Sequence, residues 1–186
     1  MTAPRDRLVA ALAAAAVFVA DQGTKLAVQR SLPLGGSRPL LGDLLRITHI
    51  MNPQGLMGLS FGQAGRHLLL PLSVMAAAAI LYLFLRWQKA GAVASAGLGM
   101  ILAGAAGNIL DRARFGAVVD FIDCDIPDIS IPPFRAAFLK FPGFFLDRWY
   151  TFNVADSAVL VGVAVLFTMT MLGERAAGKK DPAEPS

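Results

Sequence analysis

The sequence predicts an all-α integral membrane protein with four transmembrane helices and two long extracytoplasmic segments, the first of which contains short β-strands. Two observations predict this fold. Hydrophobic residues make up 55% of the 186 residues, and the mean hydropathy of +0.57 is higher than a soluble domain of this size usually shows. Four apolar stretches are also long enough to cross a bilayer, and polar clusters lie at their ends.

The net charge and the rare residues exclude several kinds of function. The charge of +4 is spread along the chain, which leaves no basic patch for nucleic acid but suits contact with anionic membrane lipids. Cys124 is the only cysteine, so an intramolecular disulfide is excluded. His49 and His67 show no metal-ligand spacing, and we expect neither a metal nor a cofactor.

The first span is expected at about residues 8–28. Arg5 and Arg7 precede an alanine-rich core with small residues before Asp21, so a cleavable signal peptide is the alternative. Apolar residues resume beyond Asp21, which makes the stretch long enough to span. Asp21 and Lys25 lie four residues apart and would pair on one helical face, unless Lys25 only snorkels to the interface.

Between the first and second spans the chain leaves the membrane over about residues 29–65. The stretch Leu45–Met51 is rich in β-branched residues and predicts a short strand. Asn52–Gly55 is typical of a turn, and Leu56–Phe61 is apolar enough to lie in the membrane interface or re-enter it. This segment therefore supplies the expected β-structure.

The second and third spans are expected at about residues 68–85 and 92–110. The third repeats small residues, with Gly99, Ala103 and Gly107 on one ridge and Gly104 near another. Such ridges allow helices to approach closely in lipid. We expect these glycines to serve packing rather than ligand contact.

The second external segment, about residues 113–152, contains eight of the twelve phenylalanines. Phe134, Phe138 and Phe141 fall at helical spacing close to two basic residues, which favours an amphipathic element on the membrane surface. A loop packed on the protein is the alternative. The fourth span follows at about residues 154–172.

Four spans place both termini on the same side of the membrane, and residues 1–173 form one domain. A charged tail, residues 174–186, is expected to be disordered. The raw count of Lys and Arg does not favour the terminal side. The short 86–91 turn, however, carries two cations and no acid, and short loops determine orientation most strongly. We therefore expect cytoplasmic termini and outward-facing long segments.

Carboxylates at the span ends indicate a chemical function. Asn108, Asp111 and Arg112 share one helical face, while Asp120 and Asp156 come from segments that can meet. Two adjacent aspartates share a proton, so one can activate water while the other protonates a carbonyl oxygen. A proton relay of a transporter and a scaffold whose acids only cap helices are the alternatives.

Four blocks resemble bacterial signal peptidase II, the lipoprotein signal peptidase: Asp21-Gln-Gly-Thr-Lys25, Gly104-Ala-Ala-Gly-Asn-Ile-Leu-Asp-Arg112, Gly116-Ala-Val-Val-Asp-Phe121 and Phe152-Asn-Val-Ala-Asp-Ser157. They lie in the family's order, and together they are specific. The resemblance implies a four-helix aspartyl protease of the bacterial inner membrane. It would remove the signal peptide from diacylglyceryl-modified prolipoproteins, cutting on the amino side of the lipidated cysteine. We expect it to act as a monomer with its site near the outer face.

The resemblance also assigns residues. Asp120 and Asp156 match the catalytic pair. The residues implied to bind substrate or brace the site are Asn52, Gly104, Asn108, Asp111, Arg112, Asn153, Ala155, Asp21 and Lys25.

Two features depart from the family pattern. Asn52-Pro-Gln-Gly55 carries an extra residue where the family has Asn-x-Gly, which leaves the contact of Asn52 open. The interval from Asp120 to Asp156 is also longer than the family's. We expect an enlarged, aromatic and partly basic flap over the site.

Overall fold

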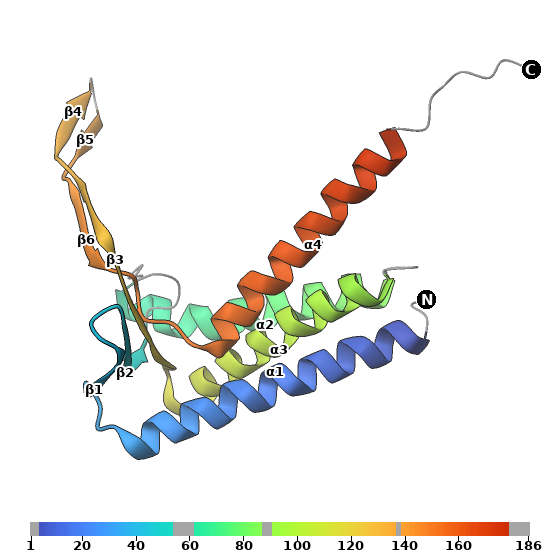
Figure 1. The fold of residues 1–186 in the computed structure, drawn as a ribbon, viewed down its shortest axis with the longest axis horizontal. Helices are drawn as coiled ribbons and strands as arrows, with labels where there is room; N and C mark the ends of the chain where they lie inside the picture. Colours follow the sequence, from blue (N-terminus) through green and yellow to red (C-terminus); the bar gives the residue numbers. More distant parts are fainter. Residues whose placement is uncertain (1–3, 54–61, 87–90, 137–138, 179–186) are drawn as a thin grey trace, which may run out of the picture.

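The computed structural model describes residues 4–53, 62–86, 91–136 and 139–178. Within these residues the helices are α1 (Pro4–Ser31), α2 (Gly62–Arg86), α3 (Gly91–Phe115) and α4 (Val154–Gly178) (Figure 1). Each contains a segment long and apolar enough to cross a membrane. The four predicted spans lie inside these helices, so each falls in a helix of membrane-spanning length. The α1 helix continues without a break through Asp21, which favours a retained span over a cleaved signal peptide.

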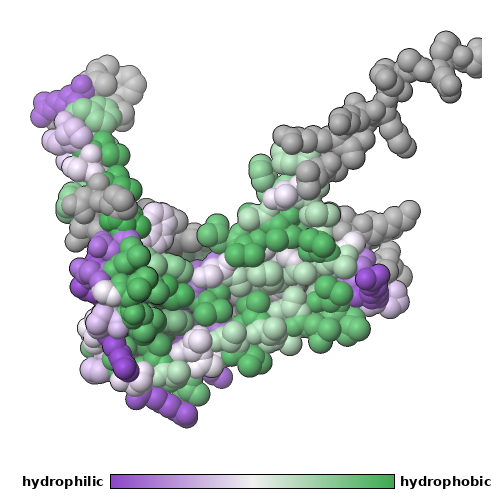
Figure 2. Space-filling model, viewed as in Figure 1, coloured by the Kyte–Doolittle hydropathy of each residue, from purple (hydrophilic) through white to green (hydrophobic). Residues whose placement is uncertain are grey.

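The α3 helix is the centre of the bundle and packs against α1, α2 and α4. Small residues make this possible, because a Cβ at Gly99 would meet the backbone of Ala10, and one at Gly104 would meet the carbonyl oxygen of Ala155. The packing interpretation of these glycines is confirmed. The other helices turn leucines and valines outward, and Figure 2 shows the hydrophobic surface that results along the bundle.

An antiparallel sheet lies at one end of the bundle, where α1 and α3 end and α4 begins (Figure 1). Its strand order is β1-β2-β3-β6, with bounds Ser37–Leu41, Leu45–Asn52, Val118–Ile131 and Phe144–Arg148. The predicted strand at Leu45–Met51 is confirmed as β2. The all-α description was too narrow, because the long strand β3 carries the sheet from the first external segment into the second.

The strand β3 has two partners along its length. Its first half pairs with β2, with Leu45 opposite Cys124 and Asn52 opposite Val118. Its second half pairs with β6 and forms a hairpin that projects away from the bundle (Figure 1).

The tip of this hairpin corrects the helical interpretation of the phenylalanines. Phe134–Ala136 forms β4 and Leu139–Phe141 forms β5, and these two short strands pair with each other. Phe134 lies opposite Phe141, and their rings stack with centroids 5.1 Å apart. Prolines bound the stretch on both sides, which leaves too few residues for a stable helix. Phe138 lies outside the described residues.

Three further expectations concern segments that the structure describes only in part or not at all. The turn expected at Asn52–Gly55 is described only as far as Pro53, and Leu56–Phe61 lies outside the described residues. The tail expected to be disordered from residue 174 begins as helix, because α4 continues to Gly178. Residues 179–186 lie outside the described part.

Candidate active site

The strand β3 and the start of α4 bring Asp120 and Asp156 together. Asp120 is only 2% exposed, whereas Asp156 lies half-buried in the first turn of α4. The backbone fixes this approach, because the amide of Ile122 donates to the carbonyl oxygen of Phe152 at 2.7 Å, and the amide of Phe152 donates to that of Ile122 at 3.1 Å. The chain entering α4 is therefore joined to β3 two residues after Asp120.

Asn153 caps α4 and orients Asp156. The backbone amide of Asp156 donates to Oδ1 of Asn153 at 2.9 Å, and the backbone amide of Asn153 donates to Oδ2 of Asp156 at 3.3 Å. This reciprocal arrangement satisfies two backbone donors that a helix start otherwise leaves unpaired. It also holds the carboxylate at the positive end of the helix dipole.

Asp120 receives hydrogen bonds from two asparagines. Nδ2 of Asn153 donates to Oδ1 of Asp120 at 2.7 Å, and Nδ2 of Asn52 donates to Oδ2 at 2.8 Å. Asn52 ends β2, so its side chain reaches Asp120 across the β2–β3 pair. The altered sequence after Asn52 does not prevent this contact, and the question left open by the sequence is answered.

Asn108 links Asp156 to a buried lysine. Its Nδ2 donates to Oδ1 of Asp156 at 2.8 Å, while its Oδ1 accepts a hydrogen bond from Nζ of Lys25 at 3.0 Å. An ammonium group can only donate, so Lys25 turns the amide oxygen of Asn108 towards itself. The NH₂ group of Asn108 must then face Asp156.

Lys25 joins two buried aspartates. Its Nζ lies 2.9 Å from Oδ2 of Asp21 and 2.8 Å from Oδ2 of Asp111, so all three ammonium hydrogens have an acceptor. Oδ1 of Asp21 accepts the backbone amide of Ala155 at 3.0 Å, and Oδ2 of Asp111 accepts that of Val119 at 3.2 Å. The predicted pair of Asp21 and Lys25 is confirmed, and it holds α1, α3, α4 and β3 in one geometry.

Gln22 is a site residue that the sequence analysis did not single out. Its Nε2 donates to Asp21 at 3.0 Å and to Asp111 at 3.3 Å, which supplies donors where one lysine serves two acids. Its position three residues before Lys25 on α1 was the available signal. Gly107 leaves room for this contact, because a Cβ there would meet Oδ2 of Asp21.

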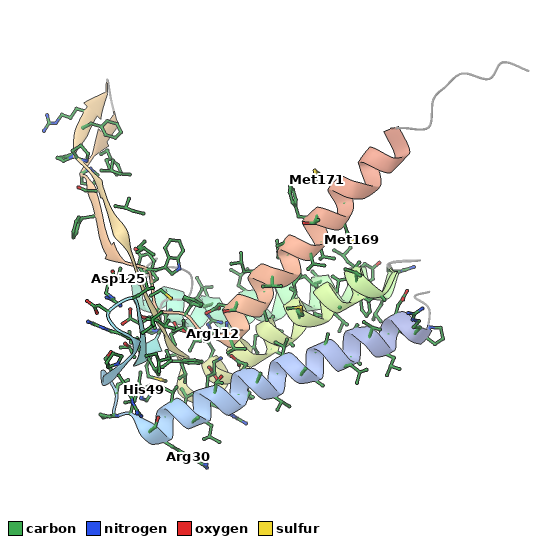
Figure 3. All side chains as sticks on the ribbon, in the orientation of Figure 1. Arg30, His49, Arg112, Asp125, Met169 and Met171 are labelled. Carbon is green, nitrogen blue, oxygen red and sulfur yellow. The ribbon has the colours of Figure 1, made fainter. Side chains whose placement is uncertain are left out.

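Arg112 lies near the start of α4 in Figure 3. The residue is half-buried, and its charge interacts with those of Asp156, Asp120 and Asp111. The sequence-predicted residues therefore gather at one end of the bundle. Gly104 allows α3 and α4 to pack closely at Ala155, and Ala155 also donates its backbone amide to Asp21.

The environment of Asp120 changes its acidity. Burial, opposed by the hydrogen bond from Asn52 and reinforced by the charge of Asp156, raises the pKa of the Asp120 carboxyl to about 7. A carboxyl with such a pKa can hold a proton at neutral pH and release it during a reaction. The carboxyl groups of Asp120 and Asp156 therefore lie close enough at this end of the bundle for the charge of one to act on the other.

Comparison with known proteins agrees with this geometry. The family model for signal peptidase (SPase) II matches residues 13–172, which is most of the chain. The chain belongs to the signal peptidase II family. Proteins named lipoprotein signal peptidase resemble it over most of their length. That of Desulforapulum autotrophicum is 38% identical over 80% of this chain and 83% of its own. That of Geobacter metallireducens is 33% identical over 95% of this chain and 98% of its own.

Solved structures support the fold of this family member. A bacterial membrane enzyme determined by the in meso method at 2.3 Å resolution has a TM-score of 0.71 and 25% sequence identity, covering 94% of both chains. A second, at 1.9 Å resolution, has a TM-score of 0.66 and 26% identity, covering 87% of this chain and 91% of its own. With the four apolar helices, these likenesses identify a multi-pass bacterial membrane protein.

Proposed function

We propose that Asp120 and Asp156 are the catalytic pair of an aspartic endopeptidase that removes the signal peptide from prolipoproteins. Membership of the signal peptidase II family and the names of its relatives support the reaction. One observation carries the assignment of the pair: Asn153 donates its side-chain amide to Asp120 and forms a reciprocal cap with Asp156. One residue thereby sets the position of both carboxylates.

In the proposed mechanism the two acids have different tasks. Asp156 is assigned the role of the ionised base, because it is less buried than Asp120 and lies at the positive end of the α4 dipole. Asn108 and Asn153 also donate hydrogen bonds to its carboxylate. Asp120 holds the shared proton, in keeping with its raised pKa of about 7. Asp156 takes a proton from water as the water oxygen attacks the scissile carbonyl carbon, and Asp120 protonates the carbonyl oxygen.

Collapse of the resulting gem-diol completes the reaction. One hydroxyl proton returns to Asp120, and the proton held by Asp156 passes to the leaving nitrogen as the carbon–nitrogen bond breaks. Arg112 lies close enough to both acids for its charge to limit their mutual repulsion. Lys25 does not touch the substrate in this scheme, and it keeps the donor group of Asn108 directed at Asp156.

Membership of the signal peptidase II family implies the substrate class, and the position of the pair at the ends of the spans suits it. Acyl chains of a diacylglyceryl cysteine can stay in the bilayer while the peptide bond on its amino side reaches Asp120 and Asp156. Removing the lipid forfeits about 0.8 kcal/mol for each methylene group no longer buried. The lipidated precursor is therefore the substrate, and the enzyme acts as a monomer in the bacterial inner membrane.

The experiment is cleavage of one purified precursor in two forms by the full chain in lipid nanodiscs. One form carries diacylglycerol on its cysteine, and the other has serine at that position. The lipidated form should be cut on the amino side of the cysteine, and the serine form should turn over far more slowly. Equal rates for the two forms, or no cleavage of either, would refute the proposed substrate.

Orientation is part of this proposal, with both termini cytoplasmic and the catalytic pair near the outer face. The short 86–91 turn with its two cations supports it. In a Cys124→Ser background, Ser186→Cys should resist an impermeant thiol reagent added to intact spheroplasts. Ready modification of that cysteine would reverse the orientation.

A further inference from the structure

In the hairpin formed by the second half of β3 with β6, the strand β6 contacts no helix among the described residues. The hairpin leaves the bundle at the sheet end and runs across the direction of α1 and α3 rather than along it (Figure 1). Helices that span a membrane lie roughly along its normal, so an element crosswise to their ends lies roughly parallel to the membrane surface. Its course alone brings the hairpin close to the lipid headgroups.

One face of the hairpin is strongly apolar. Side chains alternate along a strand, so Ile129 and Ile131 share a face while Ser130 points to the opposite one. Ile129 is 41% exposed and Ile131 is 45% exposed. The opposite face carries Ser130 and Phe145, and Phe145 is 65% exposed. The two isoleucines form a small apolar patch, whose direction rather than its size distinguishes the two faces.

The direction of the apolar face indicates what covers it. Figure 2 shows hydrophobic colour on the side of the hairpin that faces α4 and hydrophilic colour on its far side. The lipid-facing residues of the spans, such as Leu160 and Val163 of α4, are exposed in the same way. The apolar side of the hairpin and the lipid-facing surface of α4 therefore border the same space. Arg135, exposed in β4, adds a cation suited to lipid phosphates.

We propose that the hairpin lies on the membrane with the face that carries Ile129 and Ile131 in contact with lipid. The strand β3 is continuous from Asp120 to Ile131, so this contact ties the strand that bears Asp120 to the bilayer surface. The inference depends on the spans and the hairpin, and it holds whether or not Asp120 is catalytic.

The test compares adjacent positions on opposite faces. In full-length protein with Trp87→Phe and Trp149→Phe, a single tryptophan is placed by Ile131→Trp or, as the matched control, by Ser130→Trp. Each variant is reconstituted into nanodiscs of lipids brominated on their acyl chains. Brominated chains quench only tryptophans that touch them, and aqueous acrylamide reports exposure to water. Ile129→Trp provides a second position on the apolar face.

We expect Ile131→Trp and Ile129→Trp to lose most of their emission in brominated lipid and to be protected from acrylamide. Ser130→Trp should show the reverse pattern. Equal quenching by lipid at positions 130 and 131 would overturn the facial assignment. Protection of Ile131→Trp from both quenchers would mean that a second copy or another protein covers the face, and would overturn the lipid contact. Monodisperse elution of each variant before reconstitution ensures that folded protein is compared.

Discussion

Two ion clusters contact β3, the inner one at Val119 and the outer one at Asp123. The two clusters differ mainly in burial. The inner cluster consists of Asp21, Lys25 and Asp111, whose side chains are 0–3% exposed. The outer cluster is centred on Arg148, whose Nε donates to Asp123 at 2.9 Å and whose Nη2 donates to the backbone oxygen of Asp43 at 3.0 Å. Arg148 is 22% exposed and Asp43 is 62% exposed. Asp123 is buried, so solvent reaches the outer cluster at Arg148 and Asp43 only in part, but reaches it more than the inner cluster.

This difference in burial implies different roles for the two clusters. Removing charges from water costs several kcal/mol per ion, so the inner cluster persists only because every donor of Lys25 has an acceptor. Such a cluster fixes a geometry, here the direction of the Asn108 amide. The outer cluster joins β6 to β3 and to the turn between β1 and β2. Solvent reaches Arg148 and Asp43 and weakens their ion pairs, whereas the pair of Arg148 with the buried Asp123 is weakened less.

The largest effect is expected from Lys25→Met. The change leaves Asp21 and Asp111 buried without their cation, which should lower the free energy of unfolding by about 3–5 kcal/mol. Thermal unfolding in detergent micelles measures it. The double variant Lys25→Met with Asp111→Asn should recover part of the loss, because only one uncompensated acid remains. If the Lys25→Met protein were as stable as the parent, burial would not make the inner cluster more important for stability than the outer one.

The next effect is a pH dependence of stability that arises from Asp120. The pKa of Asp120 is about 7 when folded and near 3.8 when unfolded, so between these values the folded state binds the extra proton. The contribution of Asp120 to the free energy of unfolding is fully present below about pH 4 and is lost as the pH rises through 7. The loss is on the order of 4 kcal/mol.

Unfolding measured from pH 4 to pH 8 tests this dependence. The parent protein should lose stability relative to Asp120→Asn as the pH rises, because the amide cannot titrate. Parallel profiles for the parent and Asp120→Asn would show that Asp120 titrates normally.

A smaller effect is expected from Arg148→Met, which removes the centre of the outer cluster. Solvent reaches Arg148, but Asp123 is buried, so the free energy of unfolding should fall by about 1–2 kcal/mol, less than for Lys25→Met. The measurement is the same thermal unfolding, repeated at high salt, where the difference from the parent should shrink. A loss as large as that of Lys25→Met would contradict the view that burial separates the clusters.

The smallest effect on stability is expected beyond both clusters, at Ile129→Ser with Ile131→Ser. Both side chains are exposed, so unfolding in micelles should change by no more than about 0.5 kcal/mol. If the hairpin holds β3 at the bilayer surface, KM for a lipidated precursor in nanodiscs should rise while kcat stays close to that of the parent. A fall in kcat with KM unchanged would count against this link.

The sequence predicted the elements whose signals are local. Apolar length sufficed for the four spans, and β-branched residues sufficed for β2. The resemblance assigned Asp120 and Asp156, and the structure brings them together with Asn153 between them. The sequence could not predict contacts between residues that are far apart along the chain. Asn52 reaches Asp120 only because β2 pairs with β3, and Asp111 binds Lys25 from a different helix.

The hairpin tip shows a second limit. A spacing of three to four residues between Phe134, Phe138 and Phe141 fits a helix, but two short strands on either side of a turn can bring the same residues together. Phe134 and Phe141 are register partners and stack. The flanking prolines were the better guide, because they mark the ends of a stretch too short for helix formation.

The central claim is that Asp120 on β3 and Asp156 at the start of α4 are the catalytic pair. Its most direct test compares substitutions of these two aspartates with substitutions of their neighbours. Turnover of a lipidated precursor is measured for Asp120→Asn, Asp156→Asn, their double variant and the control Asp125→Asn, with expression and thermal unfolding matched. Each catalytic change should reduce turnover by at least about 10³-fold, and the double variant should be no worse than either single one. Asp111→Asn should retain part of the activity, since its carboxylate only braces Lys25 and β3, and Asp125→Asn should retain nearly all. Near-normal turnover by folded Asp120→Asn or Asp156→Asn would contradict the account.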